Sequence, residues 1–78
     1  MANNTYDMVM SGNSDNNIRF NDFRNLILSY GFVERIKGSH HVYKRYDIPE
    51  GIVIQPFGNK AKAYQVKQVR NLFKKYGL

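Results

Sequence analysis

The spacing of large apolar residues divides this chain into two helical stretches with strand-like segments between them. In the first stretch the apolar residues recur at intervals of three and four, which places them on one side of a helix; they are Phe23, Leu26, Ile27 and Tyr30. The same spacing returns near the C-terminus, at Val66, Val69, Leu72, Phe73 and Tyr76. Each stretch has one apolar side to bury, so we expect two amphipathic helices around a core that contains Phe23, Ile27, Val66, Val69 and Phe73.

Residues with strong conformational preferences mark the ends of these helices. Asn21 is the expected N-cap of the first helix, and Asp22 lies in the first turn, where a negative charge interacts favourably with the helix dipole. Gly31 is placed to close that helix in the left-handed conformation, and Gly77 ends the last helix of the chain.

Between the helices lie short runs rich in β-branched and aromatic residues. The predicted strands are 32–36 (FVERI), 40–46 (HHVYKRY) and 51–55 (GIVIQ), and the predicted turns are 37–39 (KGS) and 47–51 (DIPEG), with Pro56 as the strand stop. Connections this short favour antiparallel pairing. The predicted fold class is therefore α+β in the order α-β-β-β-α, with a three-stranded antiparallel sheet and both helices on one face. The other sheet face is then open to a partner.

Charge is distributed unevenly along the chain. Residues 1–17 hold five Asn, two Asp and no Lys or Arg, and we expect them to form a flexible N-terminal arm. All twelve cations lie in residues 18–78 against four carboxylates, so this single predicted domain has a net charge of +8. Such a charge density is typical of nucleic-acid binders, and the alternative is a basic surface that only keeps the protein soluble.

Size and composition exclude several classes of function. The chain has no cysteine, which excludes a disulfide framework and thiolate catalysis. It contains no apolar run of the roughly 20 residues that a membrane span needs and no secretory signal pattern, so we expect a soluble, cytoplasmic protein. A domain of this size buries only about 60% of its unfolded surface, which leaves little room for a deep substrate cavity. We expect it to act at its surface, without a cofactor, on a large anionic molecule.

Both histidines of the chain follow the turn at 37–39 directly. His40 and His41 have four cations close by in the sequence: Arg35, Lys37, Lys44 and Arg45. An imidazole can take a proton from a ribose 2′-hydroxyl, which then attacks the neighbouring phosphate, while cations and the turn at Ser39 hold that phosphate. Two histidines without nearby carboxylates make a poor ligand set, so we expect no metal. This pattern predicts metal-independent RNA cleavage.

Strand geometry limits this prediction. Consecutive residues on a strand face opposite sides, so His40 and His41 cannot both contact one phosphate unless a bulge intervenes. Either histidine is a candidate base, and the alternative is that both are structural.

Further cations lie in and beyond the basic loop 57–62 (FGNKAK). Lys60 and Lys62 precede the last helix, whose N-terminal amides favour anions, and we treat them as candidate phosphate contacts. We expect the helix cations Lys67, Arg70, Lys74 and Lys75 to form a solvated face.

Several short motifs occur in an order that belongs to a known family. They are YGF at 30–32, RIKGSHH at 35–41, an aromatic at Tyr43, QP at 55–56, GNKAKAYQV at 58–66 and YGL at 76–78. In this order they resemble the HicA toxin family, small RNA-cleaving proteins that are neutralised by HicB antitoxins. The resemblance covers nearly all of residues 18–78, and the Gly-Ser-His-His element is its specific part.

The resemblance implies a fold like that of double-stranded-RNA-binding domains, cleavage of messenger RNA without a metal, growth arrest when the toxin is unchecked, and a HicB-like antitoxin as partner. The family's catalytic histidine maps most directly to His40, and His41 is the alternative because some members carry it one place later. Many members have a second histidine soon after the proline that ends the third strand. This chain has Phe57 after that proline, so Lys60 and Lys62 are its candidate substitutes.

Three hypotheses follow from these patterns. The first is a HicA-like endoribonuclease (mRNA interferase) in which His40 or His41 is the base and Arg35, Lys37, Lys44, Arg45, Lys60 and Lys62 hold RNA. The second is a non-catalytic RNA-binding module of the same fold. The third is a protein that only binds its antitoxin.

Overall fold

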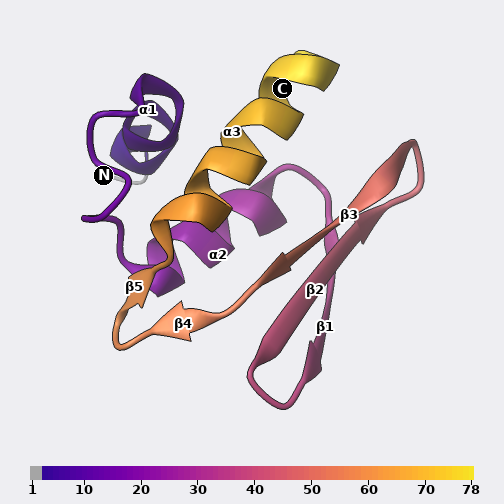
Figure 1. Cartoon of the computed structure of the whole chain (residues 1–78). Coiled ribbons are helices and arrows are strands. Elements are labelled where there is room, and N and C mark those ends of the chain that lie inside the picture. The colour runs from indigo at the N-terminus through magenta and orange to yellow at the C-terminus, as the bar shows by residue number, and fades with distance from the viewer. Residues whose placement is uncertain (1–2) are drawn as a thin grey trace.

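The computed structural model describes residues 3–78, which form three helices and five strands (Figure 1). In chain order the elements are α1 (Asn3–Ser11), α2 (Phe20–Ser29), β1 (Val33–Lys37), β2 (His40–Arg45), β3 (Ile48–Ile54), β4 (Pro56–Phe57), β5 (Lys60–Ala61) and α3 (Ala63–Tyr76). The α+β prediction is confirmed, and α1, β4 and β5 are additions to the expected order. None of the helices in residues 3–78 is long and apolar enough to cross a membrane.

The strands β1, β2 and β3 form one antiparallel sheet in that order, with α2 and α3 on the same side of it (Figure 1). The buried side chains on the helix-facing side include Tyr43, Ile52 and Ile54, whereas Ile36 of β1 on the same side is 55% exposed. On the other side Val33 and Val53 are 70% and 45% exposed. Burial thus alternates along β3, while every residue of β1 except Glu34 is exposed. The face away from the helices is open, as the sequence predicted.

The core contains all five residues that helical spacing assigned to it: Phe23, Ile27, Val66, Val69 and Phe73. The C-terminal ends of α2 and α3 also agree with the sequence. Gly31 and Gly77 both have positive φ, at 85° and 67°, which a residue with a side chain adopts only with strain.

The start of α2 differs from the prediction. Arg19, not Asn21, is the N-cap residue, and no side chain caps the helix. The reason is the strand-like segment before it: Arg19 bridges to Lys60 of β5, and the Phe20 N–H donates to the Asn59 carbonyl. The first N–H of the helix is thus satisfied by backbone from the turn between β4 and β5.

The second turn of the sheet is shorter than the sequence suggested. The predicted turn at 47–51 is wrong, because β3 already begins at Ile48 and pairs there with Arg45. Ile48 is buried, which favours its inclusion in the sheet. Pro49 is tolerated inside β3 because this strand lies at the sheet edge, where one side needs no N–H donor.

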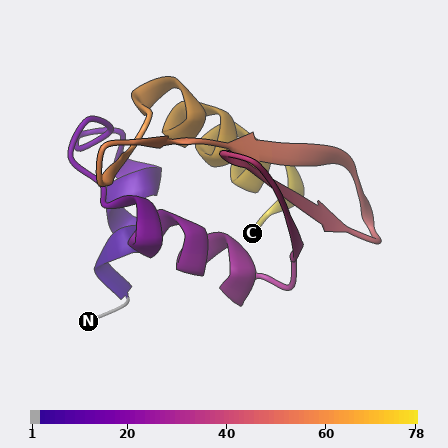
Figure 2. The ribbon, with the colours of Figure 1, turned by 90° about the horizontal axis from the view of Figure 1, so that it is seen from below.

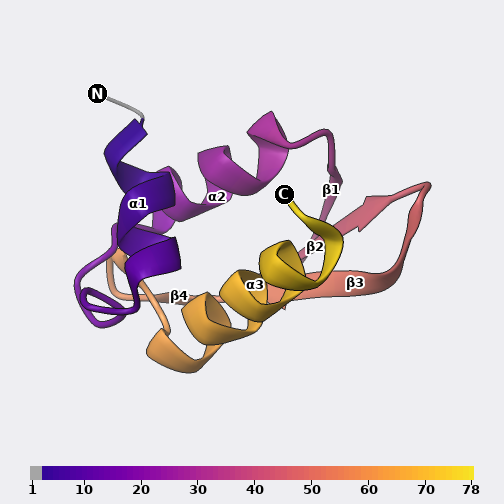
Figure 3. The same ribbon diagram turned by 90° about the horizontal axis from the view of Figure 1, so that it is seen from above.

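The flexible arm predicted over 1–17 is wrong for the residues that the structure describes. Its residues from Asn3 to Ser11 form α1, which lies beside α2 and α3 at the end away from the sheet (Figure 3). Val9 is fully buried, and the Tyr6 hydroxyl donates to the Leu78 carbonyl at 2.9 Å. Arg70, predicted to be solvated, instead donates to both carboxylate oxygens of Asp15 at 2.9 and 3.1 Å.

Residues 57–62, predicted as a loop, contain the second half of a small hairpin made by β4 and β5. Gly58 has a φ of 62° in its turn. The hairpin lies beside the start of α2, at the opposite end of the molecule from the turn between β2 and β3 (Figure 2). The Ala61 N–H donates to the Ile18 carbonyl, and this contact joins β5 to the segment that precedes α2.

Candidate functional site

The two adjacent histidines of β2 lie on opposite faces of the sheet. Pairing is regular here, with Lys37 opposite His40 and Ile36 opposite His41, and the irregularity of β2 lies further along, between Tyr43 and Arg45. His40 is exposed, whereas the side chain of His41 is only 16% exposed. The two imidazoles therefore cannot act together on one phosphate, which agrees with the limit set by strand geometry.

His41 belongs to a cluster of polar groups under α2. Its ring packs edge-on against Phe20 with 4.9 Å between centroids, and its Nδ1 lies 3.4 Å from Glu34 Oε2. Arg24 donates to both oxygens of Glu34 at 2.5 and 2.8 Å, and the buried Tyr43 hydroxyl donates at 2.5 Å. Glu34 is thus the common acceptor of an arginine, a tyrosine and a histidine.

Electrostatics in this cluster favour the charged carboxylate. The Arg24 guanidinium, with help from the Tyr43 hydroxyl and His41, lowers the pKa of Glu34 from 4.5 to about 2. Glu34 in turn raises the pKa of Arg24. Burial, and then the carboxylate beside it, raises the pKa of the Tyr43 phenol. The geometry and the charges describe a structural cluster that joins α2 to β1 and β2.

His40 has a different set of neighbours. Its Nε2 lies within hydrogen-bonding distance of the Gln55 side-chain nitrogen, at 2.5 Å. The Lys62 ammonium donates to the Gln55 side-chain oxygen at 2.9 Å. These three residues come from β2, from the position after β3 and from the position before α3, so the fold brings together segments that are well separated in the sequence.

The backbone around this group is held by the start of α3. Gln65 is 5% exposed, and its side-chain oxygen accepts the Gln55 backbone N–H at 3.0 Å. The Lys62 carbonyl accepts the N–H groups of Gln65 and Val66, which places Lys62 as the N-cap residue of α3. The positions of residues 55 and 62 are therefore fixed by the same turn of helix.

Three of the predicted RNA contacts share the open face with His40. Arg35, Lys37 and Lys44 line a shallow groove together with Val33 and Val42. Within residues 3–78 none of these three cations is in an ion pair with an Asp or Glu, whereas Arg24, Arg45, Arg70 and Lys75 each are. The structure thus gathers positive charge on this face without acidic partners.

Two other predicted site residues, Arg45 and Lys60, have partners away from His40, whereas Ser39 directly precedes it. Arg45 points to the helix side, where it pairs with Asp47 and donates to the Tyr30 carbonyl at 2.9 Å. Lys60 in β5 donates to Asn17 at 3.1 Å. Ser39 is exposed in the turn between β1 and β2.

The sequence analysis missed Gln55 and Gln65 as members of this site. Gln55 was used only as part of the motif before Pro56. Its proximity to His40 follows from register, because His41 is opposite Ile54 and the position directly after β3 is then level with His40. The register could have been inferred from the hydrophobic alternation of the two strands.

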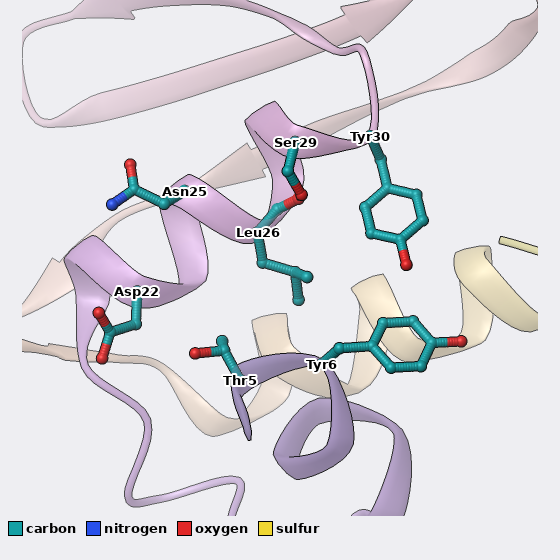
Figure 4. Close-up of a pocket in the computed structure, with 7 residues that line it drawn as sticks. All are labelled: Thr5, Tyr6, Asp22, Asn25, Leu26, Ser29 and Tyr30. Carbon is teal, nitrogen blue, oxygen red and sulfur yellow. The ribbon is translucent and has the colours of Figure 1, made fainter. Parts of the chain in front are cut away.

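A separate cavity of about 330 Å³ lies between α1 and α2 (Figure 4). Thr5, Asp22, Asn25 and Ser29 supply its polar lining, and Tyr6, Leu26 and Tyr30 its larger surfaces. Neither histidine and none of the predicted RNA contacts lines it. Within residues 3–78 no three His, Asp or Glu side chains gather as a metal-binding group.

Comparison of the chain with protein-family models, with curated proteins and with solved structures finds no match.

Proposed function

We propose that this protein is a HicA-like endoribonuclease that cleaves messenger RNA without a metal, with His40 as its general base. The observation that carries the proposal is the position of His40, an exposed imidazole on a strand face that also presents Arg35, Lys37 and Lys44. His41 is a poor candidate because its ring packs against Phe20 of α2 and its Nδ1 faces Glu34 of β1.

In the proposed reaction His40 removes the proton from a ribose 2′-hydroxyl. The resulting oxygen attacks the adjacent phosphorus, the bond to the 5′-oxygen breaks, and the products are a 2′,3′-cyclic phosphate and a free 5′-hydroxyl once that oxygen takes up a proton. In this reaction Lys62, which shares the Gln55 side chain with His40, offsets the charge that develops on the phosphate. The open-face cations hold the flanking phosphates.

The proposal includes a HicB-like antitoxin as the protein that neutralises this activity. The resemblance of the Gly-Ser-His-His element supports that partner. Because Arg35, Lys37 and Lys44 are positively charged, the antitoxin needs an acidic surface to compete with RNA for them.

The test is incubation of the pure protein with a long RNA in excess EDTA, alongside His40→Ala and His41→Ala variants. We expect wild-type cleavage, a loss of 10²–10⁴-fold in His40→Ala as is typical for removal of a general base, and retained cleavage in His41→Ala. Thermal unfolding of each variant tests whether His41, and not His40, has a structural role. His41→Ala is expected to lower stability by about 1 kcal/mol, because it removes a buried ring and a hydrogen bond, while His40→Ala is expected to change it little.

Intact RNA in all samples, with binding that weakens as salt rises, would leave a non-catalytic RNA-binding module. Cleavage lost in His41→Ala but kept in His40→Ala would overturn the assignment of the base.

A further inference from the structure

The Gln55 side chain touches both groups that the proposed reaction uses. Its amide nitrogen faces His40 Nε2 and its amide oxygen accepts from the Lys62 ammonium. Amide nitrogen and oxygen look alike in shape, so the chemistry of the neighbours must decide which end faces which group.

Lys62 decides the orientation. An ammonium group can only donate hydrogen bonds, so the amide oxygen must face Lys62, and the amide N–H groups then face His40. His40 Nε2 must accept, which means that the neutral ring carries its proton on Nδ1. The reverse amide orientation would set N–H groups against the ammonium, donor against donor.

The amide therefore presents the same groups that RNA would present. Its N–H donates to the lone pair of His40 Nε2, as an attacking 2′-hydroxyl would. Its oxygen accepts from Lys62, as a phosphate oxygen would. We propose that the Gln55 carboxamide is a built-in cap that occupies His40 and Lys62 until RNA displaces it; this inference rests on the proposed function of His40 as the base.

The local structure allows the cap to leave without unfolding the strand. The Gln55 backbone N–H is held independently by the buried Gln65 side chain at 3.0 Å. A pocket of about 230 Å³ beside the group, lined also by Tyr64 and Gln68, gives the amide space to move. Displacement thus breaks two side-chain hydrogen bonds and leaves the backbone contacts intact.

The first test measures the tautomer of His40 directly and requires no RNA. In ¹⁵N-histidine-labelled protein at about pH 8, where free imidazole is neutral, we expect His40 Nε2 to show the shift of a non-protonated nitrogen that accepts a hydrogen bond. Gln55→Glu replaces the donor by a carboxylate that only accepts, so it should transfer the ring proton to Nε2. Gln68→Ala, which changes the same pocket without touching the ring, should leave the spectrum as in wild type.

A protonated Nε2 in the wild-type protein would overturn the cap. So would a His40 spectrum that does not respond to Gln55→Ala.

The second test measures binding of a 2′-O-methyl RNA oligonucleotide, which cannot be cleaved. We expect Gln55→Ala to bind about five-fold more tightly than wild type, because the phosphate oxygens of this RNA no longer compete with the amide for Lys62; its methylated 2′-oxygen has no O–H to donate to His40. Gln68→Ala should bind as wild type does. Equal or weaker binding by Gln55→Ala would show that Gln55 contacts or positions the RNA and is not a cap.

Both readouts are separate from catalysis. A protein that never cleaves RNA but shows the expected tautomer and the tighter binding of Gln55→Ala would retain the cap and lose only the assignment of nuclease activity.

Discussion

The two sides of β2 at His40 and His41 place the same residue type in opposite settings. His41 lies against Phe20 and Glu34, in a cluster where a carboxylate joins α2 to two strands. His40 is exposed beside the Gln55 amide, whose oxygen accepts a hydrogen bond from the Lys62 ammonium. The comparison shows that proximity in sequence does not imply a shared role, because strand alternation separates the two rings.

The acceptors also differ between the two sides. On the His41 side all donors converge on one ionised carboxylate, which is only 13% exposed. On the His40 side, within the described residues, the hydrogen bonds of the His40 ring, Lys62 and Gln65 involve amide groups and no carboxylate. A buried ion pair stabilises the fold only while its geometry is kept. Side-chain hydrogen bonds near the surface can instead be replaced by hydrogen bonds to a ligand. We therefore expect stability to depend on one side and RNA chemistry on the other.

Glu34→Gln, on the His41 side, should have the largest effect on stability of the substitutions proposed for this protein. The amide cannot satisfy Arg24, Tyr43 and His41 as the carboxylate does, and Arg24 loses its counter-charge. We expect a loss of about 2–3 kcal/mol, which in a domain of this size lowers Tm by roughly 10–20 °C. Thermal unfolding followed by circular dichroism measures it.

Gln55→Ala is the matched control on the His40 side and should shift Tm by only a few degrees, because it removes hydrogen bonds near the surface. Equal losses in Glu34→Gln and Gln55→Ala would mean that both sides are structural. RNA cleavage by Glu34→Gln, assayed below its Tm, should stay close to wild type.

Lowering the pH should reduce stability through Glu34 and Glu50 by different amounts, because the two carboxylates differ in exposure. The pKa of Glu34 is lowered to about 2, mainly by Arg24, and that of Glu50 is also lowered to about 2, mainly by Lys75. A carboxyl whose folded pKa lies below its ordinary 4.5 stabilises the protein above that pH, and the contribution is lost as pH falls toward 2. Glu34 is 13% exposed and Glu50 is 37% exposed, so solvent and salt screen Glu50 more.

We therefore expect Tm to fall between about pH 5 and pH 2, with Glu34→Gln flattening that fall more than Glu50→Gln does. The measurement is a series of melts at low and high salt. A larger effect of Glu50→Gln at high salt would contradict the ranking.

The sequence predicted the parts of this fold that depend on periodicity. Local patterns predict core residues such as Phe23 and Phe73. They also predict the glycines that follow α2 and α3, and the three-stranded sheet. The N-terminal helix was missed because its asparagine content outweighed a short apolar spacing at Tyr6, Val9 and Met10. That helix is held by contacts from residues near the other end of the chain, such as Arg70, which no local pattern reveals.

The candidate site was predictable in its residue types but not in its partners. Alternation along a strand was enough to expect that His40 and His41 would separate. Which of them faces the helices depends on the side that buries Tyr43, Ile52 and Ile54, and Gln55 reaches His40 only through the register between β2 and β3. The partners of His40 therefore depend on the pairing of β2 with β3, which the residue types alone do not reveal.

Lys44→Gln, on the open face, should have the smallest effect on stability and RNA binding of the proposed substitutions, apart from the controls. Lys44 is exposed beside Val33 and Val42, so we expect its loss to change stability by less than about 0.5 kcal/mol. If it contacts one phosphate of a single strand, the slope of log K against log salt should decrease by about 0.7. Lys74→Gln removes the same charge from an exposed position on α3 and should leave the slope unchanged. Equal changes in both variants would mean that RNA binding depends on total charge, and would contradict the open face as the binding surface. A change in Lys44→Gln alone would locate the RNA on the side of β2 that carries His40.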